Sequence, residues 1–89
     1  MVSKRISIRL GRMRANPLGD WTIGDIADVC EEHEIRCMPP RAGGSHWKVS
    51  HPTQRDILTI PQRRPIKPHC IRLLVKFIDA VLKARHAES

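Results

Sequence analysis

The chain has 89 residues, which is enough for one small domain and excludes barrels, dinucleotide-binding folds and other folds that need a larger core. Hydrophobic residues make up 40% and charged residues 28%, a balance typical of a folded globular domain. The net charge is +7. Because clustered cations release condensed counterions from a polyanion, nucleic acid is the first partner to consider.

The charges are segregated along the chain. Residues 1–14 carry five basic side chains and no acid, whereas residues 20–34 carry six acids and no Lys or Arg. Between Arg36 and Lys76 there are nine basic residues and a single acid, Asp56. The middle of the chain and its N-terminal part should therefore hold an anion, and the acidic segment should face away from a nucleic acid.

The cysteines and the lack of an apolar segment indicate in which compartment the protein is expected. Cys30, Cys37 and Cys70 follow no regular spacing, which favours a reducing compartment and a cytoplasmic protein. A zinc site made from Cys30, His33 and Cys37 with His69 or Cys70 would match no common zinc motif, so we expect no metal and no cofactor. No apolar run approaches the ~20 residues of a membrane span, and we expect no membrane partner.

Two amphipathic helices are predicted. Thr22 and Asp25 have the spacing of a capping box and precede apolar residues at helical spacing, which predicts a helix over residues 23–34. Pro68 is an acceptable residue for a first helical turn. The helix that it opens carries one apolar stripe, made of Ile71, Leu74, Val75, Ile78 and Leu82. Its wet side is predicted to be Arg72, Lys76, Asp79 and Lys83.

Short β-type runs separated by Pro and Gly predict three strands between these helices, over residues 36–38, 45–51 and 56–60. The expected fold is α+β, in the order α-β-β-β-α, with a three-stranded antiparallel sheet and the helices on one of its faces. We expect a domain over residues 21–85, preceded by a basic arm, residues 1–20, and followed by a C-terminal tail, residues 86–89.

Alternation along the second strand separates its side chains. Trp47 and Val49 are expected toward the core, and His46, Lys48 and Ser50 on the open face. An open sheet face with basic and polar residues is a reasonable platform for RNA.

Several segments in this region carry a family resemblance when they are taken in order. They are Gly44-Ser45-His46, His51-Pro52, Ile57-Leu58-Thr59-Ile60-Pro61, Ile66-Lys67-Pro68 and Ile71-Arg72-Leu73-Leu74. Over about residues 22–82 the chain resembles the HicA toxins of bacterial type II toxin-antitoxin systems. The resemblance implies a double-stranded-RNA-binding-domain-like fold, metal-independent endonucleolytic cleavage of mRNA, growth arrest, and neutralisation by a HicB antitoxin.

The chain departs from the family pattern at two places. The family often has a second histidine where this chain has Trp47, and it usually begins close to the first helix. The basic arm, residues 1–20, could strengthen RNA binding, contact the antitoxin or result from a misassigned start codon.

The resemblance implies that His46 is the catalytic residue. Imidazole suits this role because its unperturbed pKa of ~6.5 keeps both protonation states available near neutrality. Lys48 lies two residues along on the same face, where its ammonium can reach the same phosphate. His51 falls on the opposite face and is assigned a structural role. The remaining candidate RNA contacts are Ser45, Arg41, Arg63, Arg64 and Lys67.

Two other functions are alternatives for this sequence. A non-catalytic RNA-binding module of the same fold would use His46 as one more polar contact. A helix-turn-helix DNA-binding protein would have to place the acidic residues 20–34 against a phosphate backbone, which is unfavourable.

Overall fold

The C-terminal helix α3 (Pro68–Glu88) carries the apolar stripe against which the other elements pack. Its buried residues are Cys70, Ile71, Leu74, Val75, Ile78 and Val81. Pro68 lies in the first turn, where an N–H would lack a helical partner, and the carbonyl of Lys67 accepts the N–H groups of Cys70 and Ile71. The structure is a computed structural model and describes residues 7–42 and 44–88.

Helix α2 (Ile23–Glu32) begins at the predicted capping box. Thr22 Oγ1 accepts the Asp25 N–H at 3.2 Å, and Asp25 Oδ2 accepts the Thr22 N–H at 2.9 Å. The helix ends two residues before the predicted limit, at a turn in which Glu34 has a φ of 59°. The N–H of Ile35 then bonds the Cys30 carbonyl at 2.8 Å, as in a Schellman motif, and directs the chain into the first strand.

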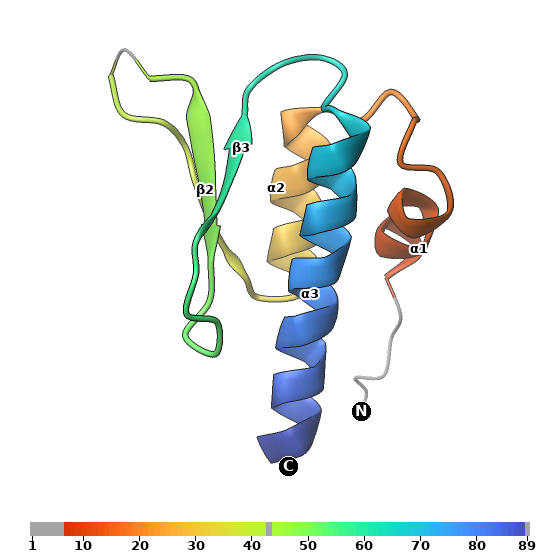
Figure 1. The fold of residues 1–89 in the computed structure, drawn as a ribbon, viewed down its shortest axis with the longest axis vertical. Coiled ribbons are helices and arrows are strands. Elements are labelled where there is room, and N and C mark those ends of the chain that lie inside the picture. The colour runs from red at the N-terminus through yellow and green to blue at the C-terminus, as the bar shows by residue number, and fades with distance from the viewer. Residues whose placement is uncertain (1–6, 43, 89) are drawn as a thin grey trace.

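The three predicted strands form one antiparallel sheet in the order β1-β2-β3. Strand β1 spans Arg36–Met38, β2 spans His46–Ser50 and β3 spans Leu58–Pro61. Helix α2 contacts β1 and α3 contacts β3, so both helices cover the same face of the sheet and leave the other face open (Figure 1). The α+β class and the antiparallel sheet are confirmed, with strand ends shifted by one or two residues.

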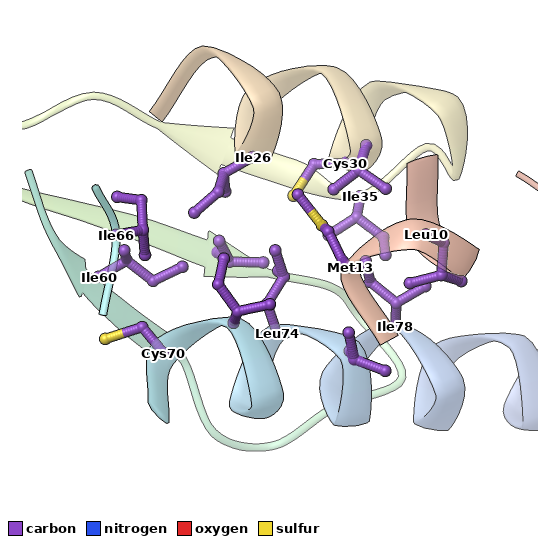
Figure 2. Close-up of a cluster of buried hydrophobic side chains, with 14 of the residues drawn as sticks. Leu10, Met13, Ile26, Cys30, Ile35, Ile60, Ile66, Cys70, Leu74 and Ile78 are labelled. Carbon is purple, nitrogen blue, oxygen red and sulfur yellow. The ribbon is translucent and has the colours of Figure 1, made fainter. Parts of the chain in front are cut away.

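Helix α1 (Ile8–Ala15) is absent from the predicted order. The Ser7 side chain caps it by accepting the Leu10 N–H at 3.1 Å. Leu10 and Met13 are buried and point from α1 into the hydrophobic cluster (Figure 2). Part of the segment expected as a basic arm is therefore a helix that completes the core on the side of α2 and α3 away from the sheet (Figure 1).

Two cations of α1, Arg9 and Arg14, bind acids of this same chain. Arg14 donates to both carboxylate oxygens of Asp79, at 2.7 and 2.8 Å, and this contact raises the pKa of Arg14 above its ordinary value. Arg9 pairs with Glu32 and lies 3.8 Å from Asp28. Asp79, predicted on the solvent-exposed side of its helix, keeps 43% of its side chain exposed while it pairs with Arg14. Arg9 and Arg14 therefore contribute less to an external anion field than their charges suggested.

The C-terminal end also differs from expectation. Helix α3 continues to Glu88 and includes most of the expected tail, residues 86–89. Within residues 7–42 and 44–88, no helix combines the length and the apolar character that crossing a membrane requires.

The burial of α1 generates a stability prediction. Met13 is 0% exposed and Ile8, on the same helix, is 73% exposed. Met13→Ala should lower the free energy of unfolding by about 2–4 kcal/mol because it leaves a cavity in the core. Ile8→Ala should change it by less than about 0.5 kcal/mol. Urea unfolding followed by circular dichroism measures both, and equal effects of the two changes would contradict the packing of α1.

Candidate nucleic-acid interface

The candidate site is the outer face of β2, which carries His46 and Lys48. Val49 is buried in the core and Trp47, two residues before it on the same face, is half-buried, so the intervening side chains point outward. His46 and Lys48 are both exposed, and within the described part of the chain neither forms a hydrogen bond or an ion pair through its side chain. The structure thus brings the predicted catalytic histidine and its neighbouring lysine to one open surface.

The strand register identifies the residues that share this surface. Residues directly opposite each other in an antiparallel pair lie on the same face of the sheet. His46 lies opposite Pro61, and Lys48 lies between Met38 on β1 and Thr59 on β3. Ser50 lies opposite Arg36. The outer face therefore runs from an imidazole through an ammonium to a guanidinium.

Arg36 is a candidate that the sequence reasoning missed. It is exposed, and within residues 7–42 and 44–88 it forms no ion pair. Its pairing with Ser50 places it four residues from His46 along the sheet, roughly 13 Å at the usual rise of a strand. The signal was present in the alternation of the strand over residues 36–38, but the face of Arg36 follows only from its register with β2.

The loops that flank His46 hold two of the predicted basic contacts. In an antiparallel sheet the β1–β2 loop and the segment after β3 emerge at the same end, which is also the end where His46 begins β2 (Figure 1). Arg41 lies in the first of these loops and Arg63 in the second, and both are exposed. They extend the basic surface beyond the end of the sheet.

A close turn in the β1–β2 loop precedes His46. The Gly44 N–H donates to the Arg41 carbonyl at 2.8 Å. A Cβ at position 44 would lie 3.2 Å from that carbonyl and 3.3 Å from Cβ of Pro40, closer than most side-chain contacts. A side chain at position 44 would therefore crowd the turn that leads into β2.

Arg64 differs from the other predicted contacts because it has a partner within the chain. Its Nη2 donates to Asp20 at 3.1 Å, and the carboxylate raises the pKa of Arg64 above its ordinary value. Lys67 is exposed at the start of α3, in the same connection from β3. The structure gathers Lys48, Arg41 and Arg63 with His46, whereas the guanidinium of Arg64 is already compensated.

Ser45 and His51 do not converge on the imidazole of His46. The Ser45 carbonyl accepts the Gln62 N–H at 2.7 Å, which continues the pairing of β2 and β3 and, by alternation, directs Ser45 to the helix side. His51 follows the other end of β2, where its Nδ1 accepts the Thr53 N–H at 3.2 Å and lies 2.8 Å from Thr53 Oγ1. The contacts of His51 shape a turn and agree with the structural role assigned to it.

The cysteines and the buried histidine belong to the packing of α2. His33 Nδ1–H donates to the Val29 carbonyl at 2.8 Å, and the ring is buried. Contact with Cys37 and burial raise the pKa of the Cys30 thiol above its ordinary value, and the same contact lowers the pKa of Cys37. No group of three or more His, Cys, Asp or Glu in the described residues is arranged to hold a metal ion.

Two grooves formed by the described residues lie away from the outer face of β2. One lies between α1 and α2 and includes Arg12 and Trp21. Another, of about 410 Å³, lies between the start of β3 and α3 and includes Leu73 and Phe77. The candidate site is thus an open surface, which suits an extended polymer better than a small molecule.

The comparisons with known proteins give no relative. No protein family, no curated protein and no solved structure matches the chain.

The exposure of His46 predicts its chemical reactivity. Diethylpyrocarbonate should modify His46 many times faster than His33, because His46 is exposed whereas His33 is 7% exposed and bonded to Val29. Mass spectrometry of peptides from the folded protein measures both rates. Unfolding in urea should make the two histidines equally reactive, and equal rates before unfolding would place His46 elsewhere.

Proposed function

We propose that this chain is a metal-independent endoribonuclease, the toxin of a type II toxin-antitoxin system, similar to the HicA family. The observation that carries the proposal is His46 of the Gly44-Ser45-His46 segment, exposed at the start of β2 with Lys48 beside it on the same face. The order α2-β1-β2-β3-α3, with both helices on one side of the sheet, supports a double-stranded-RNA-binding-domain-like arrangement.

The chemistry uses the nucleophile that RNA itself carries. The 2′-hydroxyl attacks the adjacent phosphorus, the bond from phosphorus to the 5′-oxygen breaks, and the products are a 2′,3′-cyclic phosphate and a 5′-hydroxyl. His46 accepts the proton of the 2′-hydroxyl, and water supplies a proton to the leaving oxygen at this open face. The ammonium of Lys48 stabilises the negative charge that develops on the phosphoryl oxygens.

The mRNA binds along the open face through its backbone. Lys48 lies next to His46, Arg36 lies further along the sheet, and Arg41 and Arg63 flank the end at which His46 begins. Exposed cations of this kind hold phosphates without reading sequence. The acids of α2 lie on the covered side of the sheet, where they do not oppose the RNA.

The partner that neutralises the toxin is a HicB-like antitoxin. Its contact surface should be acidic, because it must cover the cations around His46 and Lys48 and exclude RNA from them. The same surface then serves RNA and antitoxin in turn, and the setting of both is the bacterial cytoplasm.

Replacement of the histidine tests the proposal. His46→Ala should lower the rate of RNA cleavage by the purified protein by at least ~100-fold, the usual contribution of a general base, and should abolish growth arrest on induction. The fold should persist because the side chain is exposed. Single-turnover cleavage of a labelled mRNA fragment, with and without EDTA, gives the rates, and EDTA should not change the wild-type rate.

His86→Ala is the matched control, because His86 is also exposed but lies in the last turn of α3, and it should leave cleavage unchanged. Wild-type cleavage by the His46→Ala protein would refute the assignment of the base. Tight RNA binding by a wild-type protein that cleaves nothing would instead identify a non-catalytic RNA-binding module.

A further inference from the structure

Gln62, the residue after β3, makes hydrogen bonds to both sequence neighbours of His46, which are Ser45 and Trp47. Its backbone N–H donates to the carbonyl of Ser45 at 2.7 Å. Its side-chain Oε1 accepts the indole N–H of Trp47 at 2.9 Å. The residues immediately before and after the candidate base are therefore both held by one glutamine.

The ladder geometry explains why His46 needs this support. Hydrogen-bonded and non-hydrogen-bonded pairs alternate in an antiparallel sheet. The bond from Gln62 to Ser45 makes that pair hydrogen-bonded, so the next pair, His46 with Pro61, is non-hydrogen-bonded. This position tolerates Pro61, whose nitrogen has no hydrogen to donate. It also leaves the backbone of His46 without hydrogen bonds to β3.

The other neighbour of β2 gives His46 no ladder bonds either. The pairing of β1 with β2 ends at Met38 and Lys48. Continuing the same register by two residues would place Pro40 opposite His46. Pro39 and Pro40 follow Met38 and have no N–H groups to donate. The backbone at His46 is thus fixed through its two neighbours. Ser45 is held by the backbone N–H of Gln62, and Trp47 is held by its ladder pairing with Ile60 and, through its indole, by the side chain of Gln62.

We propose that Gln62 is a positioning residue for His46, an inference that rests on the proposed nuclease function. By alternation Gln62 shares the helix-facing side of β3 with Ile60, whereas His46 is on the outer face. Gln62 therefore acts through Ser45 and Trp47 without touching the RNA at His46. Trp47 lies directly opposite Ile60, which is fully buried, so the indole that Gln62 holds belongs to a residue paired with the core.

A positioning role predicts a particular kinetic signature. A displacement of about 1 Å at a reacting group can cost ~100-fold in rate, even when the changed residue lies outside the site. Gln62→Met keeps the length of the side chain and removes the acceptor. We expect kcat for RNA cleavage to fall at least ~10-fold with KM unchanged, because the phosphate contacts remain.

Three further variants separate positioning from a general loss of structure. Trp47→Phe removes the indole donor and should lower kcat to a similar extent, and the double variant should be no slower than the slower single variant, because both remove one interaction. Gln62→Glu retains an acceptor for the indole and should keep kcat near the wild-type value. Gln54→Met is the matched control, because Gln54 lies in the β2–β3 loop and its side chain bonds Thr53 instead.

Amide hydrogen exchange provides a readout that is independent of activity. In Gln62→Met the Trp47 indole and the backbone amide of Trp47 should exchange at least ~10-fold faster than in the wild type and in Gln54→Met. Unchanged exchange overturns the proposal whatever the cleavage rates are. Faster exchange with unchanged kcat in an active enzyme also overturns it. If the wild-type protein itself cleaves no RNA, faster exchange in Gln62→Met still shows that Gln62 holds Trp47. The missing cleavage then refutes the nuclease function and not the contacts of Gln62.

Discussion

The pairing of β2 on both of its edges is the constraint on which the rest of the structure depends. Because side chains alternate along a strand, the register that buries Val49 also directs His46 and Lys48 outward. A shift by one residue would turn the imidazole into the core and Val49 into solvent. The hydrophobic burial that stabilises the domain and the display of the candidate base are therefore two results of the same register.

Basic and acidic segments that are separate in the sequence pair with each other in the fold. Arg9 and Arg14 of α1 pair with acids of α2 and α3, and Arg64 pairs with Asp20. The cations left without such partners include Lys48 and Arg36 on the outer face of the sheet. The net charge of +7 already counts these acids, and part of the cationic excess that remains lies on the outer face of the sheet.

Local patterns in the sequence predicted the elements whose cause is local. The capping box at Thr22 and the alternation around Val49 act within a few residues, and both were found as predicted. Pro61, expected to stop the third strand, is instead the last residue of β3. Helix α1 was missed because eight residues do not make a stable helix alone, and its apolar residues gain burial only from α2 and α3.

The candidate site shows the same division. His46 and Lys48 could be placed on one face from the alternation of a single strand, whereas the face of Arg36 depends on pairing between strands. The hydrogen bonds of Gln62 join residues that are 15 or more positions apart in the chain, and no pattern in the sequence indicates them. Likewise, Asp20 and Arg64 lie far apart along the chain, so the sequence did not indicate that Asp20 neutralises Arg64, a predicted RNA-binding residue.

The most direct test of the account is whether the RNA supplies the nucleophile. A short RNA that the purified protein cleaves at one known position should be prepared with a single 2′-deoxy nucleotide on the 5′ side of that bond. The account predicts that cleavage at this bond stops, while the all-ribose RNA yields a 2′,3′-cyclic phosphate and a 5′-hydroxyl in the presence of EDTA. Cleavage of the deoxy-substituted bond at the normal rate would contradict the role given to His46.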